Sequence, residues 1–395
     1  MLRFSFMPRP PAASPVVSGI RGSVYSALLH HLETHKGEIY PLHVGDTWKL
    51  PPEGCRMANL KTTEHRGLSQ YTAPQGMPEL VDAVVERVRQ RTGIAVERGN
   101  VFITGGATAG IASAVGAVVS PGDEVLLLAP HWPLVDGIVR MFGGRPVPVP
   151  FFGAVDSAEV AVAALRAAAT SRTVALYVNT PNNPTGRILP RPLLEAIAEW
   201  ARKQNVWLLF DEVYEDYVYQ GEHTWGLSLA PDRAIANHSF SKAYGMAGYR
   251  CGYLAGPAAI VAEALKIHTH TTYSSPTASQ AAALRVLAGP GDAWVRETRE
   301  EYREVGRLAA ERLGIPPPEG STFLFLDVSR RTAGAGLDAF LEGCAKEGLF
   351  AAPGPSFGPY PNHIRICYTA APPAVVARGI EVLVARLAVP LRADR

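Results

Sequence analysis

Short apolar runs without polar alternation recur between residue 100 and about residue 256, separated by longer segments with helical spacing. Uninterrupted apolar runs are typical of strands that are buried on both faces, as in a parallel sheet. Their alternation with helices predicts an α/β fold in which helices are layered on the sheet. The predicted strands are 101–104, 125–129, 173–179 and 206–210, with weaker candidates at 234–239 and 252–254, and the clearest helices between them are 107–119 and 190–203.

The rest of the chain follows a different pattern. The first twenty residues read as an irregular arm, and a helical face at 24–32 and a helix from Pro78 precede the sheet. A chain of 395 residues exceeds one hydrophobic core of ordinary size, so two subdomains are expected. After residue 256 an α+β region is predicted, with helices at 257–268, 277–287, 292–313, 337–346 and 373–387, and strands at 323–328 and 364–368.

Composition limits the classes of function. The 38 basic and 36 acidic residues give a formal net charge of +2, which gives no sign of a nucleic-acid or membrane-surface partner. The four cysteines are far apart, so neither a zinc ribbon nor a redox dithiol is indicated, and no metal site is predicted. No uncharged run reaches the roughly 18–20 residues of a spanning helix, and residues 1–18 lack the apolar run of a signal peptide. The expected location is the reducing cytoplasm.

Ligands of parallel α/β sheets bind at the carboxyl ends of the strands, so the residues after each run are the first candidates. The run Gly-Gly-Ala-Thr-Ala-Gly at 105–110 follows the first strand. Small residues at a strand-to-helix turn let backbone N–H groups approach an anion, and Thr108 adds a hydroxyl. A tight turn explains the glycines equally well. The run is neither Gly-x-Gly-x-x-Gly nor Gly-Lys-Ser/Thr, which argues against dinucleotide and P-loop sites.

The next three strand ends carry an aromatic ring, an amide and a carboxylate. Trp132 is suited to stack on a planar ring, and a packed core Trp is the simpler alternative. Asn183 lies in a turn, where turn residues are expected in any case. Asp211 ends an apolar run, and a carboxylate there is costly unless it is paired. A protonated ring nitrogen is one suitable partner, and a salt bridge to a protein Arg is the alternative.

Lys242 ends the run Ser-Phe-Ser-Lys at 239–242, among small and aromatic residues. Desolvation and cationic neighbours lower the pKa of a lysine, which makes its amine nucleophilic. Arg250 follows eight residues later and has the planar fork that suits a phosphate. Five strand ends together supply an anion cradle, a stacking ring, an amide, a carboxylate and an amine. These are the groups that a phosphorylated pyridine aldehyde requires.

The order and spacing of these motifs resemble the class I/II aminotransferases of the fold-type I pyridoxal-phosphate-dependent superfamily, from about residue 16 to residue 390. The resemblance implies a large domain with a mostly parallel seven-stranded sheet in α/β/α layers, joined to a smaller α+β domain. The expected limits are 1–43 for an N-terminal arm and part of the small domain, 44–275 for the large domain and 276–395 for the C-terminal small domain. The motifs are Asn-Asn-Pro-Thr-Gly at 182–186, Asp-Glu-Val-Tyr at 211–214, Ser-Phe-Ser-Lys at 239–242 and Gly-Tyr-Arg-Cys-Gly at 248–252.

The resemblance also implies a role for each matched residue. Lys242 would hold pyridoxal 5′-phosphate as a Schiff base and then act as the general acid/base. Asp211 would keep the ring nitrogen protonated, so that the ring acts as an electron sink. Asn183, whose bond to Pro184 is expected to be cis, would bind the ring oxygen together with Tyr214. The remaining cofactor contacts are expected from Ala107, Thr108, Trp132, Ser239, Ser241 and Arg250.

The implied reaction moves the α-amino group of an L-amino acid to a 2-oxo acid by a ping-pong mechanism. Arg365 would clamp the substrate α-carboxylate, Gly45 would line that pocket, and Ile20 is expected near the side chain of the substrate. Tyr71 resembles the family tyrosine that reaches the phosphate of the partner subunit, which implies a homodimer with shared sites. Some relatives that act on acidic substrates carry a Lys at the position of Ala107, which argues against a dedicated aspartate enzyme.

Several alternatives stay open. A pyridoxal-phosphate lyase or cyclase would use the same groups, because the reaction depends on which substrate bond stands perpendicular to the ring. A non-catalytic binding module on this fold would not need both Lys242 and Asp211. An NAD-dependent enzyme would need a glycine fingerprint that the chain lacks. Trp48 and Tyr249 are further candidates for apolar pocket residues, and the polar stretch 266–273 is expected either near a neighbouring site or at a surface helix end.

Overall fold

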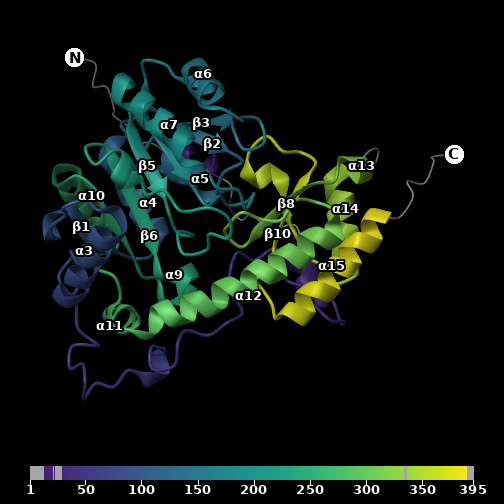
Figure 1. Ribbon diagram of the computed structural model, residues 1–395, viewed down its shortest axis with the longest axis horizontal. Coiled ribbons are helices and arrows are strands. Elements are labelled where there is room, and N and C mark those ends of the chain that lie inside the picture. Colours follow the sequence, from purple (N-terminus) through teal and green to yellow (C-terminus); the bar gives the residue numbers. More distant parts are fainter. Residues whose placement is uncertain (1–12, 21, 23–28, 333–335, 389–395) are drawn as a thin grey trace, which may run out of the picture.

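A seven-stranded sheet forms the centre of the larger part of the molecule, in a computed structural model that describes residues 13–20, 22, 29–332 and 336–388 (Figure 1). The strand order is β1-β7-β6-β5-β4-β2-β3, and only β7 runs antiparallel to its neighbours. The predicted mostly parallel seven-stranded sheet is therefore confirmed. The strands are β1 Val101–Thr104, β2 Glu124–Ala129, β3 Arg145–Pro150, β4 Thr173–Asn179, β5 Trp207–Asp211, β6 Ala234–Ser239 and β7 Gly252–Ala255.

β3 is the one strand of this sheet that sequence reasoning missed. It lies at the sheet edge, pairs only with β2, and contains three prolines. Proline cannot donate to a strand ladder and is tolerated at edges. Only Pro146 and Val149 of β3 are buried, whereas every residue of β2 is buried. The segment therefore has neither the continuous apolar run nor the β-branched composition that identified the other strands.

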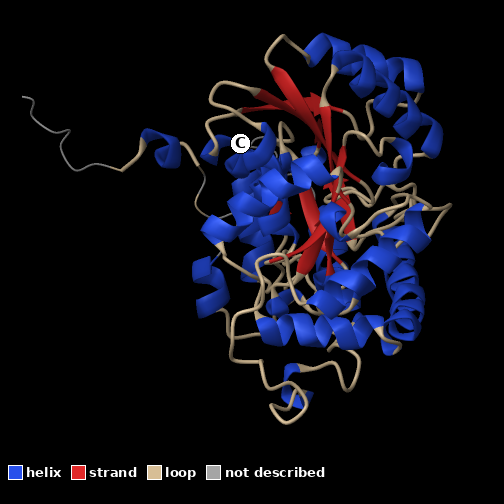
Figure 2. Cartoon of the chain, turned by 90° about the vertical axis from the view of Figure 1, so that its left-hand side faces the viewer, coloured by secondary structure: helices blue, strands red, loops and turns tan. Residues whose placement is uncertain are grey.

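Helices cover both faces of the sheet (Figure 2). One apolar core joins the sheet to α4 Ala107–Val118, α5 Leu134–Met141 and α10 Ala258–Thr271. A second core joins the opposite face to α3 Pro78–Thr92, α6 Ala158–Ala168, α7 Arg191–Gln204 and α11 Thr277–Leu287. Sequence periodicity predicted α3, α4, α7, α10 and α11 and missed the short α5 and the alanine-rich α6. Two one-turn helices, α8 Gly226–Leu229 and α9 Phe240–Ala243, flank β6.

A smaller sheet with its own core makes up most of the C-terminal part. Its strands, in the antiparallel order β8-β10-β9, pack against the last helices and against Leu42 from the N-terminal part of the chain. The long helix α12 joins the two parts, because Val295 lies in the core of the large sheet and Tyr302 in that of the small one. The elements are α12 Pro290–Leu313, β8 Phe323–Asp327, α13 Ser329–Thr332, α14 Gly336–Lys346, β9 Ala352–Pro353, β10 His363–Cys367 and α15 Pro373–Ala388.

The N-terminal region corrects one expectation. The first twenty residues were predicted to be an irregular arm, but Pro15–Ser18 form a short helix, α1, and Pro at its first position favours a helix start. Residues 1–12 lie outside the described part. The helical face predicted at 24–32 lies partly outside it as well, and the described helix α2 is Leu29–Thr34. The predicted domain limits stay a prediction.

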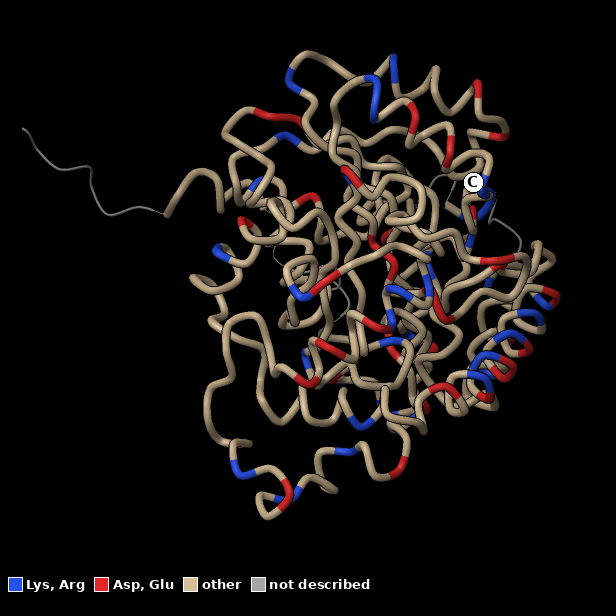
Figure 3. Tube along the Cα trace, turned by 60° about the vertical axis from the view of Figure 1, so that its left-hand side comes forward, with Lys and Arg blue, Asp and Glu red and all other residues tan. Residues whose placement is uncertain are grey.

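Basic and acidic residues are interspersed along the Cα trace (Figure 3). On α12, Arg303 and Arg307 pair with glutamates three or four residues away, and Arg312 reaches Glu381 of α15. Exposed pairs of this kind stabilise a helix by only a few tenths of a kcal/mol. Within the described residues, none of the helices combines the length and apolarity needed to cross a bilayer.

A buried ion network ties α3 to the loop that follows β5. Arg91 pairs with Glu215 and, at 2.5 Å, with Asp216, and Arg87 pairs with Asp216 at 3.2 Å. These side chains are at most 19% exposed, so each charge depends on its partner rather than on water. Glu215 also bonds the buried imidazole of His238 at 2.7 Å, which places the network directly behind the carboxyl ends of β5 and β6.

Replacing Arg91 by Met should lower the free energy of unfolding by roughly 3–5 kcal/mol, because the buried carboxylate of Glu215 would lose its arginine partner and Asp216 would keep only Arg87. Arg98→Met is the matched control, since its pair with Asp82 is more than half exposed and should change stability by less than about 1 kcal/mol. Urea unfolding of both variants measures the difference. Equal small losses would show that the network does not depend on Arg91.

Candidate active site

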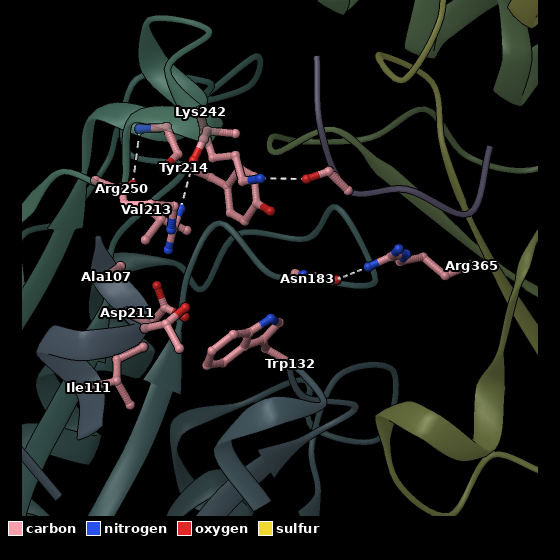
Figure 4. A pocket seen from close by; sticks show the side chains of 15 residues that line it. Ala107, Ile111, Trp132, Asn183, Asp211, Val213, Tyr214, Lys242, Arg250 and Arg365 are labelled. Carbon is pink, nitrogen blue, oxygen red and sulfur yellow. Dashed lines mark hydrogen bonds between the residues drawn. The ribbon is translucent and has the colours of Figure 1, made fainter. Parts of the chain in front are cut away.

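A cavity of about 240 Å³ opens at the carboxyl ends of the parallel strands (Figure 4). All predicted site residues except Ile20 and Tyr71 line it. They come from β5, β6, the start of α4, α9 and the small-sheet strand β10, and from the loops that carry Gly45, Trp132, Asn183, Tyr214 and Arg250. Sequence reasoning missed Ile111, Val213 and Ala247, whose apolar side chains carry no chemical signal. The lining residues are Gly45, Ala107, Thr108, Ile111, Trp132, Asn183, Asp211, Val213, Tyr214, Ser239, Ser241, Lys242, Ala247, Arg250 and Arg365.

One end of the cavity is built to receive an anion. Gly106 has φ +79°, and a Cβ there would lie 2.6 Å from a guanidinium nitrogen of Arg250, so only glycine fits between the turn and the cation. The first residues of α4 follow at once, and the N-terminus of a helix offers free backbone N–H groups and a partial positive charge. The Ser239 side chain accepts from the backbone N–H of Ser241 at 3.0 Å and caps α9. This arrangement suits a phosphate.

Asp211 is buried at the end of β5 and has one oxygen satisfied by the protein. The hydroxyl of Tyr177 donates to Oδ2 at 2.5 Å, and the backbone N–H of Val213 also bonds the carboxyl group. Oδ1 is buried and has no partner among the described residues. Burial raises the pKa of Asp211 to about 6, although Tyr177 and Val213 act in the opposite direction. The site therefore fits a ligand that brings a donor, such as a protonated ring nitrogen, to Oδ1.

Lys242 points into the cavity from α9. Its Nζ donates to the backbone oxygen of Gly45 (Figure 4). Burial lowers the pKa of Lys242, and the nearby carboxylate of Asp46 partly opposes this shift. A lower pKa increases the fraction of neutral amine, which is the form that attacks a carbonyl carbon or accepts a proton.

Arg365 stands at the end of the cavity away from Arg250 (Figure 4). One of its nitrogens donates to the amide oxygen of Asn183 at 3.1 Å, and another donates to the backbone oxygen of His43. The guanidinium carbon lies 4.4 Å from the ring centre of Phe323 and 5.0 Å from that of Phe357. Hydrogen bonds and two aromatic rings thus hold a buried cation in a fixed orientation, which suits bidentate binding of a carboxylate.

Trp132, Asn183 and Tyr214 enclose the middle of the cavity. The bond from Asn183 to Pro184 is cis, as the family resemblance implied, and the backbone N–H of Asn183 donates to the Asn179 side chain at 2.7 Å. Burial raises the pKa of Tyr214 well above its usual value, so its hydroxyl stays protonated and can donate. Its ring packs edge-on against Phe323, with the ring centres 5.5 Å apart.

Ile20 and Tyr71 do not line this cavity. Ile20 sits beside Gly137 of α5, and Tyr71 is 85% exposed with its ring 5.0 Å from that of Tyr273. Trp48 and Tyr249 do not line the cavity either; Trp48 is 41% exposed, and the Tyr249 hydroxyl accepts from the backbone of Met57. The roles predicted for these residues stay predictions.

The stretch 266–273 is the end of α10, and one of its residues supports the anion end of the cavity. His268 is fully buried, and its Nε2 accepts from the backbone N–H of Gly105 at 3.2 Å. Burial lowers the pKa of His268 to about 4, so the ring stays neutral and keeps this acceptor near neutral pH. The sequence alone could not assign this role to His268. Its contact with the Gly105 turn appears only when α10 is placed beside β1.

A group with metal-ligand chemistry lies behind the cavity. Glu212, Glu215 and His238 bring ligand atoms within 4.8 Å of one another. These atoms are already engaged: His238 bonds Glu215, and Glu212 accepts from the backbone N–H of Gly226 at 2.8 Å. Glu212, Glu215 and His238 are therefore part of the buried ion network that supports β5 and β6.

Because the pKa of Asp211 is raised above its unfolded value, the folded protein without ligand holds this proton more tightly than the unfolded chain. The resulting stability is present below pH 4 and is lost as the pH rises through about 6. Relative to Asp211→Asn, the cofactor-free wild type should lose roughly 3 kcal/mol between pH 4 and pH 7.5. Urea unfolding at both pH values measures this, with the exposed Asp156→Asn as control. A difference that does not change with pH would contradict the burial of an ionisable group at 211.

Comparison with known proteins identifies the family. A model of the aminotransferase class I and II family matches residues 38–383. A probable aspartate/prephenate aminotransferase of Thermus aquaticus is 34% identical over 341 residues, which cover 84% of this chain and 87% of that protein. The arginine–pyruvate transaminase AruH of Pseudomonas aeruginosa is 32% identical and is matched over 83% of this chain and 85% of its own length.

Solved structures agree with the sequence relatives. An aspartate aminotransferase from Thermus thermophilus, solved with maleate, superposes with a TM-score of 0.87 at 29% identity and covers 95% of this chain and all of its own. The N-succinyldiaminopimelate aminotransferase of Mycobacterium tuberculosis gives a TM-score of 0.85 at 27% identity, with the same coverage. These names favour amino transfer over the elimination, cyclisation and binding alternatives. The chain belongs to the aminotransferase class I and II family and is an aminotransferase of fold type I.

Proposed function

We propose that this protein transfers the α-amino group of an L-amino acid to a 2-oxo acid, with pyridoxal 5′-phosphate bound through Lys242. The observation that carries the proposal is that the Lys242 amine and the Asp211 carboxyl line the same cavity, between two arginines at its opposite ends. Arg250 and the start of α4 suit a phosphate, and Arg365 suits a carboxylate. A phosphorylated pyridine and an amino acid together present these two anions.

The described residues account for every polar part of the cofactor. The turn at Gly106, the side chains of Ser239 and Ser241, and Arg250 would hold the phosphate, and Oδ1 of Asp211 would accept from the ring nitrogen. Trp132 would stack on the ring, and Asn183 and Tyr214 would bind its oxygen. When bound, the cofactor supplies an electrophilic carbon for the substrate amine and an electron sink for the pair left at the substrate Cα.

The protein would contribute orientation and proton transfer. Lys242 Nζ is the basic atom of the cavity that is free to move on a flexible stem, so it would take the proton from the substrate Cα. Its lowered pKa favours the neutral amine for this step. Arg365 would fix the α-carboxylate of the substrate. Its hydrogen bond to Asn183 would hold the Asn183 side-chain amide in position to contact the cofactor. A Cβ at position 45 would lie 3.2 Å from the ring of Phe323, so a side chain there would crowd the carboxylate pocket.

The active protein is proposed to be a homodimer with shared sites. Tyr71 is 85% exposed and Tyr273, beside it, is 45% exposed with φ +68°, so two aromatic rings stand at the surface of one protomer. A second subunit would cover them and would bring Tyr71 to the phosphate of the other site, and Ile20 is proposed to act near the substrate side chain. The cytoplasm is the proposed location, in agreement with four cysteines that are buried free thiols.

A panel of amino donors and 2-oxo acid acceptors tests the function as a whole. The purified protein loaded with pyridoxal phosphate should convert its 2-oxo acid acceptor to an amino acid, and each half-reaction should proceed alone, because a ping-pong enzyme stores the amino group between substrates. The aspartate/prephenate and arginine–pyruvate relatives define the first donors to try. Release of ammonia without an acceptor would instead indicate elimination.

Lys242→Ala should abolish covalent attachment of pyridoxal phosphate and lower kcat by at least about a thousandfold, because the nucleophile and the general base are the same amine. Borohydride reduction followed by peptide mass analysis locates the modified lysine. Lys266→Ala is the control, since Lys266 is exposed and paired with Glu263. Labelling of another lysine in the wild type would overturn the assignment.

Arg365→Lys should raise KM for every amino acid substrate and lower kcat/KM by about a hundredfold, since an ammonium cannot replace a bidentate fork. The affinity for pyridoxal phosphate should change little, because Arg365 lies at the other end of the cavity. Arg187→Lys serves as the control, as its pair with Glu319 is outside the cavity. An unchanged KM would remove Arg365 from the carboxylate site.

A further inference from the structure

Tyr177 is a buried tyrosine in the middle of the large sheet, and the mechanism proposed above does not use it. Its side chain is 1% exposed, and its hydroxyl donates to Oδ2 of Asp211 at 2.5 Å. It does not line the cavity. A residue of this kind influences a bound ligand only through the group that it contacts.

The register of the sheet explains how Tyr177 reaches Asp211. β4 and β5 are parallel, with Tyr177 opposite Leu209 and Asn179 opposite Asp211. Residues two positions apart in a strand share a face, so Tyr177 stands one repeat, about 6.6 Å, before the level of Asp211 and on its side of the sheet. The Tyr177 side chain extends along β4 and spans this distance. Asn179 completes the support, because its amide donates to the backbone oxygen of Asp211 at 2.9 Å.

Packing alone does not explain the hydroxyl. The ring of Tyr177 lies in an apolar core with Phe102, Leu127 and Leu209, where a phenylalanine would fill the same volume. A buried hydroxyl costs free energy unless it is hydrogen-bonded, and here its partner is a carboxylate that faces the cavity with its other oxygen. A hydrogen bond to an ionised group is roughly twice as strong as a neutral one. The tyrosine is therefore matched to the charged form of Asp211.

We infer that Tyr177 is a positioning residue for the cofactor: its hydroxyl fixes the orientation of the Asp211 carboxylate and keeps the negative charge on it, so that Oδ1 holds a protonated ring nitrogen. The inference rests on the proposed function, since it concerns the same site. Burial raises the pKa of Asp211 and raises that of Tyr177 well above its usual value, so the proton of this bond stays on the tyrosine. Without the hydroxyl, Asp211 would compete more strongly for the proton of the ring.

Tyr177→Phe removes one oxygen and keeps the ring. We expect the dissociation constant of pyridoxal phosphate, measured on the apoprotein by fluorescence quenching, to rise about tenfold, the ratio that corresponds to one unit in the pKa of the Asp211 carboxyl. The second probe is the analogue in which the ring nitrogen is replaced by carbon. The affinity for this carbon analogue should not fall, because the analogue has no ring nitrogen to donate to Asp211. With amino acid substrate, kcat should decrease and KM should stay close to that of the wild type.

Tyr253→Phe is the matched control. Its hydroxyl is also buried, lies on β7 of the same sheet, and forms no hydrogen bond in the described structure. The Tyr253→Phe variant should bind pyridoxal phosphate and the carbon analogue with the same affinities as the wild type. Equal losses for the two probes in Tyr177→Phe would assign Tyr177 a packing role, and no loss for either would remove it from the site. Both results would overturn the inference.

A wild type that does not bind pyridoxal phosphate would refute the proposed function instead, so the two failures are distinguishable. Where Tyr177→Phe does not fold, 3-fluorotyrosine at position 177 keeps the ring and makes the hydroxyl a stronger donor. The affinity for pyridoxal phosphate relative to the carbon analogue should then increase. An unchanged ratio would overturn the inference.

Discussion

The carboxylate of Asp211 is buried at the carboxyl end of β5, the central strand of the large sheet, and much of the surrounding structure serves to keep it there. An isolated charge in this position is costly, and its pKa is accordingly raised to about 6. The protein supplies Tyr177 and the backbone of Val213 for part of the carboxyl group and leaves Oδ1 to a ligand. The protein's own groups therefore leave the carboxylate partly unsatisfied, and a cationic ring nitrogen would complete it.

The two anion-binding ends of the cavity belong to different cores, so their separation depends on how the small sheet is attached. The attachment is made of backbone: the N–H groups of Glu319 and Gly320 donate to the oxygen of Gly186, each at 2.9 Å. Gly186 has φ +70°, and a Cβ there would lie 2.6 Å from the oxygen of Phe323. The turn that carries Asn183 is thus clamped to β8, whose neighbour β10 carries Arg365. This clamp fixes Arg365 relative to the turn that carries Asn183.

Sequence reasoning found the parts of the site that combine a chemical group with a strand end. Lys242 and Asp211 were predictable because each follows an apolar run, and parallel strands bring their carboxyl ends together. Arg250 was predicted from its place eight residues after Lys242. Arg365 came from the family resemblance, since nothing local marks β10 as a neighbour of the larger sheet. Tyr177 and His268 were not found: each lies inside an element, and its role appears only through a partner on another element, Asp211 or Gly105.

The same desolvation acts in opposite directions on the two central groups. Desolvation raises the pKa of Asp211 and lowers that of Lys242, so the protein alone pushes both groups toward their neutral forms. A ligand that brings a positive charge to one end restores the ionised form of Asp211 and leaves the Lys242 amine neutral and reactive. The two pKa values therefore move toward each other, and strongly perturbed groups that share a cavity are typical of a functional site. The environment of each group follows from where it lies: Asp211 is held by β4 and β5, and Lys242 extends from the short helix α9 toward Gly45.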